Sequence, residues 1–205
     1  ISQVKPDVVH VHNFFPTLSP SIFWACFHRS VPVVMTLHNY RLICPSATFY
    51  IDGKLNTKSI KNGPWWTLQK KVYRESWLGT LAIILMIEIH RLMGTWKRID
   101  KYIALTNFSK NQFVKSGWSA EKIAVKPNFI TFDRLSNVEK NNRDYALFVG
   151  RLSEEKGLSC LLSAWSDIDF PLKVVGDGDL KNKVVEAGGC VEYVGHKSSM
   201  EVQSL

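Results

Sequence analysis

Cysteine is scarce in this 205-residue sequence, and no two cysteines stand close together. The four that it has, Cys26, Cys44, Cys160 and Cys190, form no CxxC pair. Disulfide frameworks and zinc knuckles depend on more closely patterned cysteines, so both are disfavoured. We therefore expect a reducing compartment and a cytoplasmic location.

The common nucleotide-binding and hydrolase signatures are also missing. The sequence has no GxGxxG stretch, no Walker A motif and no GxSxG motif, which argues against a dinucleotide fingerprint, a P-loop and a serine-hydrolase elbow. The apolar stretch 78–89 has twelve residues with Glu88 as its one charge, whereas about 20 residues are needed to cross a bilayer. With 45% hydrophobic and 21% charged residues, the composition is that of a globular protein.

What the sequence does contain is an alternation of short apolar runs with helical stretches. The apolar runs, which we interpret as strands, lie at 8–11, 31–37, 102–105, 123–126, 146–149, 172–175 and 191–194. The helical stretches between them lie at 20–29, 106–116, 157–166 and 179–187. Most of the apolar runs are continuous, which is typical of parallel strands covered on both faces. Repeated strand–helix–strand units predict a doubly wound α/β fold.

A polar, highly charged stretch at 131–144 interrupts this alternation. We interpret it as a linker between an α/β unit at 1–130 and a second unit at 145–205; the alternative is a surface loop within one sheet. Near the end of the sequence, Ser198 and Glu201 have the spacing of a helix-opening capping box. Since only four residues follow, we expect two incomplete domains from a longer protein.

Residues 54–101 carry most of the positive charge. They include ten Lys or Arg and three acids, and the net charge of the whole chain is +8. We predict a basic helical insert at about 54–100, either buried between neighbouring elements or lying in a membrane interface with its cations toward anionic headgroups. A non-enzymatic membrane- or nucleic-acid-binding module is the alternative reading of the charge. Because the cations flank an apolar helix and no nucleic-acid-binding motif is present, we expect no nucleic-acid partner.

Two predicted strands are each followed by a histidine and an asparagine. His10 and His12 are two positions apart, so they project to the same side, and Asn13 follows. His38 and Asn39 follow the next strand, at the edge where open α/β sheets bind ligands. A metal site is one interpretation, but no second histidine-and-carboxylate cluster accompanies the pair. Hydrogen bonding to a substrate is favoured, and satisfaction of local backbone groups is the alternative.

The stretch 149–157, VGRLSEEKG, places two cations between a strand and a helix. Arg151 and Lys156, together with the N–H groups of a helix start, fit a diphosphate. The alternative is a solvated turn whose lysine pairs with one of the two glutamates. Gly176 and Gly178 end the following strand, where their lack of a side chain would let a ligand approach the backbone closely.

Several stretches together resemble family 4 glycosyltransferases of the GT-B fold. In chain order they are KPDVVHVHN, VVMTLHNYRLICP, IALTNFSKNQFVKSGW, KPNF, ALFVGRLSEEKG, VVGDGDL and VEYVGHKS. The resemblance implies two Rossmann-like domains, both incomplete here, with the nucleotide-sugar donor held mainly by the second. It implies retaining transfer of a sugar to a glycan or lipid-linked acceptor in surface polysaccharide synthesis, with no metal and no cofactor besides the donor. The enzyme would work in the cytoplasm, with peripheral attachment to the inner face of the cell membrane.

The resemblance also implies residue roles. His38 would be catalytic, beside the transferring sugar and phosphate, and Arg151 with Lys156 would hold the donor diphosphate. Asn128 would mark the hinge between domains. The remaining substrate-binding positions would be His12, Asn13 and Asn39 toward the acceptor, Gly176 and Gly178 beside the donor, and Gly195 and His196 near the nucleobase.

Some parts of the family pattern are missing from these 205 residues. The paired glutamates, seven residues apart, that would hold the donor ribose and sugar lie beyond position 205, and the first strand with its glycine-rich loop is absent. We therefore expect this chain alone to turn over little or no substrate. A GT-B epimerase or phosphorylase is a second enzymatic interpretation, which the His-Asn strand ends favour less than a transferase.

Overall fold

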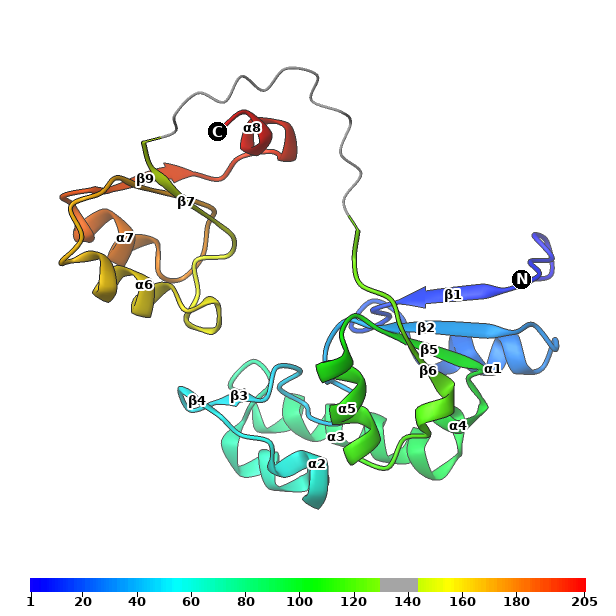
Figure 1. The fold of residues 1–205 in the computed structure, drawn as a ribbon. Coiled ribbons are helices and arrows are strands. Elements are labelled where there is room, and N and C mark those ends of the chain that lie inside the picture. Colours follow the sequence, from blue (N-terminus) through cyan, green and yellow to red (C-terminus); the bar gives the residue numbers. More distant parts are fainter. Residues whose placement is uncertain (130–143) are drawn as a thin grey trace. The chain divides into compact units, whose positions relative to one another are not determined.

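Figure 1 shows the chain as a computed structural model, which describes residues 1–129 and 144–205. The chain divides into two compact units, Ile1–Ile130 and Thr131–Leu205. Nearly all of the predicted linker, 131–144, lies outside the described residues. Both units contain a parallel sheet with connecting helices, so the predicted α/β class is confirmed.

The first unit is built on a four-stranded parallel sheet. Its strands, in spatial order, are β1 (Val9–His12), β2 (Val33–Leu37), β5 (Lys101–Ala104) and β6 (Ile123–Val125). Each lies within two residues of a predicted apolar run. In the register of the sheet, His12 is opposite Thr36. Because the strands are parallel, their carboxyl ends all reach the same edge of the sheet.

The helices of this unit gather on one side of the sheet (Figure 1). α1 (Ser21–Phe27) and α5 (Asn107–Lys115) lie where the sequence predicts them, and the Thr106 hydroxyl caps α5 by accepting from the Ser109 N–H. The elements that the sequence did not predict are short ones around the insert: β3 (Tyr50–Ile51), β4 (Lys54–Leu55), α2 (Lys58–Asn62) and α4 (Thr95–Arg98). Such elements are too short to show a periodic apolar pattern.

The two faces of this sheet differ. The face toward the helices carries a row of buried apolar side chains: Val11, Val33, Met35, Leu37, Tyr102, Ala104 and Ile123. On the opposite face His10, His12 and Ala124 are exposed. Among the described residues the prediction of strands covered on both faces is therefore wrong for this sheet, because the helices lie on one side only.

α3 (Trp77–Leu92) contains the apolar stretch. It has apolar side chains on a buried face and on a face exposed to solvent. Ile83, Ile84 and Ile87 are buried. Leu78 and Leu92, in contrast, are 71% and 85% exposed. The interpretation that this helix is buried between neighbouring elements therefore holds for one of its faces only. Within residues 1–129 and 144–205, every helix falls short of the length and hydropathy of a membrane span.

The second unit is a smaller parallel sheet with three helices. The strands β7 (Ala146–Val149), β8 (Leu172–Val175) and β9 (Val191–Gly195) pair in that order, and α6 (Leu158–Trp165) and α7 (Lys181–Ala187) follow β7 and β8. Five fully or almost fully buried side chains form its core: Leu152, Leu158, Leu172, Val174 and Val184. The last helix, α8 (Ser199–Ser204), opens with the predicted capping box.

Candidate functional site

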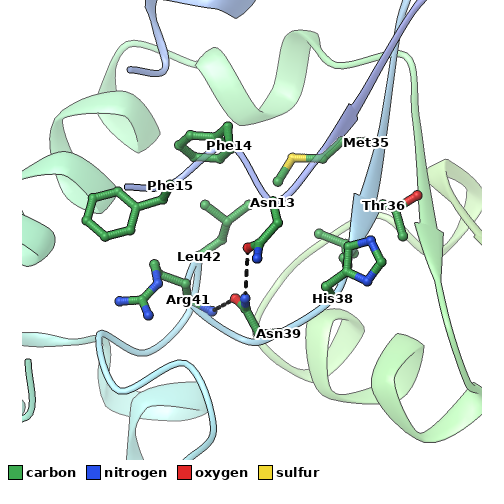
Figure 2. Close-up of a pocket in the computed structure, with 10 residues that line it drawn as sticks. Asn13, Phe14, Phe15, Met35, Thr36, His38, Asn39, Arg41 and Leu42 are labelled. Atoms are coloured by element: carbon green, nitrogen blue, oxygen red, sulfur yellow. Dashed lines mark hydrogen bonds between the residues drawn. The ribbon is translucent and has the colours of Figure 1, made fainter. Parts of the chain in front are cut away.

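The carboxyl ends of β1 and β2 bring four predicted site residues together: His12, Asn13, His38 and Asn39. His12 Nδ1 and His38 Nε2 share a hydrogen bond of 2.9 Å, and the Asn39 amide donates to Asn13 Oδ1 at 3.0 Å. Figure 2 shows the asparagine pair. We call these four residues the strand-end cluster. The prediction that the two strand ends meet at one edge is confirmed, because β1 and β2 are neighbours in parallel register.

His10 extends this row of imidazoles along the open face of the sheet. Its ring centroid is 4.1 Å from that of His12, and its Nε2 shares a hydrogen bond of 2.8 Å with Thr36 Oγ1. Partial burial, and next the charge of His12, lower the pKa of His38; partial burial likewise lowers the pKa of His10. Both rings therefore stay neutral near pH 7, each with one N–H and one lone pair, and one of these two already serves the hydrogen bond to His12 or to Thr36.

Arg41 is a cation at this site that the sequence analysis did not single out. Its guanidinium lies beside two rings that contact each other, 5.0 Å from the centroid of Phe15 and 5.4 Å from that of Tyr73, with the two ring centroids 5.8 Å apart. It donates to the Pro45 carbonyl at 3.0 Å, and the Arg41 backbone N–H donates to Asn39 Oδ1 at 3.0 Å. Burial lowers the pKa of Arg41, but a guanidinium remains charged at neutral pH. Its position two residues after Asn39 is the signal that could have found it.

The pocket between these residues is small. Figure 2 shows it, with Asn13, His38, Asn39 and Arg41 among the side chains around it. Its volume is about 20 Å³, which is room for a water-sized group. A ligand as large as a sugar would therefore lie on the strand-end cluster and not inside this pocket. Among the described residues, no group of three or more His, Cys, Asp or Glu side chains is arranged to hold a metal ion.

In the second unit, the loops after β7 and β8 are joined backbone to backbone. The Gly150 N–H donates to the Val175 carbonyl and the Leu152 N–H to the Asp177 carbonyl, both at 3.0 Å. A Cβ on Gly176 would lie 1.9 Å from the Gly150 oxygen, and one on Gly178 would lie 2.5 Å from the Leu152 oxygen. The space that a Cβ would take at these glycines is therefore filled by the chain itself; that a donor lies beside them stays a prediction.

Arg151 and Lys156, the predicted diphosphate ligands, are both exposed in the loop that follows β7. The Arg151 guanidinium is 3.8 Å from the Glu155 carboxylate. The Glu154 carboxylate accepts hydrogen bonds from the Ser159 hydroxyl and from the Lys183 ammonium. These bonds, the one from Ser159 most, lower the pKa of Glu154. Within the described part of the chain, neither glutamate pairs with Lys156, so the alternative of a lysine–glutamate turn is not what forms.

The remaining predicted positions lie at strand or unit ends. The Gly176 N–H donates to the Gly195 carbonyl at 2.9 Å, which joins the ends of β8 and β9. His196, which follows Gly195, is exposed. Asn128, close to the end of the first described range, is also exposed. Gly195 thus lies beside Gly176, while the nucleobase role of Gly195 and His196 and the hinge role of Asn128 stay predictions.

Comparison with known proteins places this geometry in context. A family model for Glycosyltransferase Family 4 matches residues 1–134. An uncharacterized glycosyltransferase of Methanocaldococcus jannaschii is 34% identical over 111 residues, which cover 52% of this chain and 30% of the relative. The amylovoran biosynthesis glycosyltransferase AmsD of Erwinia amylovora is 29% identical over 96 residues, covering 42% of this chain and 27% of the relative. The chain thus spans about a third of the length of the curated relatives it matches.

One solved structure shares the fold over nearly the whole chain. The Anabaena protein HepE, crystallised with UDP and glucose, superposes with a TM-score of 0.54 at 15% sequence identity. The match covers 96% of this chain and 50% of the HepE chain. At this level of identity the likeness concerns the fold.

Proposed function

The chain belongs to glycosyltransferase family 4, and on that premise we propose that it is part of an enzyme that moves a sugar from a nucleotide-diphosphate donor to a glycan or lipid-linked acceptor, with retention of anomeric configuration. The similarity to AmsD, an amylovoran biosynthesis glycosyltransferase, supports a role in polysaccharide synthesis. The UDP and glucose bound to HepE support a nucleotide-sugar donor.

The observation that carries the proposal is the strand-end cluster. Two imidazoles and two side-chain amides meet at the ligand-binding edge of a parallel sheet. These groups donate to and accept from sugar hydroxyls without bringing a fixed charge. In the proposed enzyme His38 lies beside the transferring sugar and phosphate as the catalytic residue, while His12, Asn13 and Asn39 bind the acceptor side.

The second unit contributes the donor site in this proposal. Arg151 and Lys156 hold the diphosphate and offset the negative charge that grows on the leaving group. Arg151 is 3.8 Å from Glu155, a long and exposed ion pair that a phosphate would displace at small cost. Gly176 and Gly178 let the loops after β7 and β8 pack tightly enough to fix this turn. Gly195 and His196 lie toward the nucleobase.

The donor site is tested by thermal unfolding of the chain with UDP, GDP and ADP. We expect one of these nucleotides to raise the unfolding temperature, because a ligand that binds only the folded state stabilises it. Arg151→Ala and Lys156→Ala should each remove the shift. Lys173→Ala, which removes a cation from the middle of β8, should keep it. No shift with any of the three nucleotides, or an equal loss in Lys173→Ala, would contradict the donor site.

We also propose that this enzyme attaches to the inner face of the cell membrane through α3. Leu78, Leu85, Ile89 and Leu92 are all exposed, and at about 100° per residue they fall within about 60° of arc. The stripe is about 21 Å long at about 1.5 Å per residue. It lies across the helix from the buried Ile83 and Ile87, so it is free to enter a lipid surface while the other face holds the helix in the unit.

Charge and aromatic residues around α3 support the same partner. Trp65 and Trp77 are exposed by 50% and 47%, and tryptophan favours the headgroup level of a membrane. Exposed cations lie near both ends of the helix along the chain, namely Lys70, Lys71 and Arg74 before it and Arg91, Lys97 and Arg98 at or after its last turn. Each contributes about 1 kcal/mol near an anionic surface. An anionic bilayer therefore matches both the apolar stripe and the charge around it.

Sedimentation with vesicles of phosphatidylglycerol and phosphatidylcholine tests this surface. We expect the chain to sediment with anionic vesicles at low salt and less at high salt. Leu85→Glu combined with Leu92→Glu should abolish sedimentation. Met200→Glu, at a position 81% exposed on α8, is the matched control and should sediment normally. Failure to sediment at low salt would refute membrane attachment and leave the donor site untouched.

A further inference from the structure

A second and much larger cavity lies in the first unit, and Leu42 lines both this cavity and the small pocket beside the strand-end cluster. Its volume is about 480 Å³, within the range of small-molecule sites. Parts of α2, α3, α4 and the loop after α5 line it. Trp96 and Lys97 precede β5 and Trp118 precedes β6, so this part of the wall lies toward the amino ends of those strands, whereas Leu42 and Ile43 follow β2. The strand-end cluster lies at the carboxyl ends of β1 and β2.

The walls of this cavity are largely apolar. They are formed by seven aliphatic and aromatic side chains: Leu42, Ile43, Ile60, Ile87, Trp96, Tyr102 and Trp118. Two contacts fix the aromatic part of the wall, because the Trp96 indole donates to the Ile87 carbonyl at 3.2 Å and the Trp118 ring lies 4.8 Å from the Tyr102 ring. Apolar walls of this extent favour a ligand that brings an apolar part out of water.

Charge at the cavity has one dominant sign. Among the described residues that line it, four are cationic, Lys61, Arg91, Lys97 and Lys122, and one, Glu88, is a carboxylate. Glu88 is 8% exposed and is already paired with Arg91. Lys122 is held in place, since its ammonium donates to the Lys97 and Ile99 carbonyls at 2.6 and 2.8 Å. The excess positive charge favours an anionic group on the ligand.

We infer that this cavity binds an anionic amphiphile, a molecule with a short apolar chain or tail end and a phosphate head. The apolar part lies against Ile60, Ile87 and Trp118, and the phosphate meets Lys61 and Lys97, which are exposed at the rim. A bare phosphate would leave the apolar walls in water, and a neutral hydrocarbon would leave the cations without a partner. Only the combination satisfies both parts of the site.

This site is separate from the proposed transfer reaction. Among the described residues that line the cavity, none belongs to the strand-end cluster, and the two rim cations, Lys61 and Lys97, lie on α2 and α4. The amphiphile therefore does not place its phosphate on His38. Two sources share the chemistry, an isoprenoid phosphate and a diacyl phospholipid, and both occur where a membrane-attached enzyme would meet them.

Isothermal titration with octyl phosphate, below the concentration at which it forms micelles, tests the inference without a membrane. We expect saturable binding, with octanol and inorganic phosphate each at least about tenfold weaker, which corresponds to about 1.4 kcal/mol. Geranyl phosphate and dihexanoyl phosphatidate then distinguish the two sources by which of them binds more tightly. The absence of saturable binding by octyl phosphate, or equal binding of octanol, would overturn the inference.

Three variants locate the binding. Lys61→Glu combined with Lys97→Glu reverses two rim charges, and Ser119→Trp fills the mouth from an exposed lining residue; both should weaken binding at least tenfold. Lys54→Glu reverses a single exposed charge on β4, outside the lining, and should bind like the unchanged chain. Circular dichroism confirms that each variant is folded. Unchanged affinity in both lining variants would refute the site even if the donor site and the vesicle binding held.

Discussion

Gly176→Ala is the sharpest perturbation of the second unit. Gly176 has φ of +143°, which is a backbone conformation that side chains rarely adopt. An added Cβ would lie 1.9 Å from the Gly150 oxygen and 3.0 Å from the Gly150 carbonyl carbon. Both atoms belong to backbone, so no side chain can swing aside to make room. The loops that follow β7 and β8 would have to separate.

The expected cost follows from what that separation breaks. The two hydrogen bonds nearest the clash are Gly150 N–H to Val175 at 3.0 Å and Gly176 N–H to Gly195 at 2.9 Å, each contributing about 1 kcal/mol. Alanine at this φ adds about 1–3 kcal/mol of strain. We therefore expect Gly176→Ala to lower the free energy of unfolding of the second unit by about 3–5 kcal/mol.

Two other glycines serve as controls for this value. A Cβ on Gly150 would meet nothing closer than 3.8 Å, and Gly189 has open space around it but φ of +58°. Gly150→Ala should stay within about 1 kcal/mol of the unchanged chain, and Gly189→Ala should lose about 1–2 kcal/mol from its backbone alone.

Amide hydrogen exchange in peptides from residues 144–205 measures the second unit separately from the first. Peptides that contain β7 and β8 should lose protection strongly in Gly176→Ala and little in the two controls. If Gly176→Ala matched Gly150→Ala, the tight packing of the two loops would be refuted. The same variant should also lose nucleotide binding, because Arg151 is part of the displaced loop.

Three further outcomes concern stability. Burial lowers the pKa of His10 and His38 from 6.5 in the folded chain. The unfolded chain therefore binds more protons near and below that pH, and the first unit should lose stability as pH falls from 7.5 to 5.5. Urea midpoints that do not change over this range would contradict the prediction. Tyr102→Phe should cost about 1–3 kcal/mol, because the buried Trp96 carbonyl loses the donor at 2.7 Å, and a loss below 0.5 kcal/mol in urea unfolding would exclude it. Ser198→Ala should cost about 1 kcal/mol and increase exchange at the start of α8; unchanged exchange there would argue against the cap.

Most of the fold could be predicted from the sequence. The seven strands of the two parallel sheets lie within two residues of apolar runs. Helices such as α5 lie between a recognisable N-cap residue and a residue that ends the helix. These signals are local, because apolar periodicity and capping residues act over a few positions. The hairpin of β3 and β4 and the one-turn α4 were missed, since segments of two to four residues are held by their neighbours and not by their own pattern.

The strand-end cluster was predicted in part. The sequence showed that His12 and His38 follow neighbouring strands, which is enough to expect them at one edge. It did not show that they hydrogen-bond each other, or that Arg41 lies against the rings of Phe15 and Tyr73. Tyr73 is 32 positions from Arg41, and no local pattern links residues so far apart.

The sequence by itself determined where strands and helices begin, that the strands are parallel, and where the positive charge is concentrated, because each of these depends on patterns among neighbouring residues. Only the tertiary structure decided which faces of those elements are buried and which are exposed to solvent. It left one face of the first sheet and one face of α3 exposed, filled the space beside Gly176 with backbone, and enclosed a cationic, apolar-walled cavity between α2, α3 and α4. Burial, close approach and enclosure depend on which distant segments pack together, and that is a property of the folded chain as a whole.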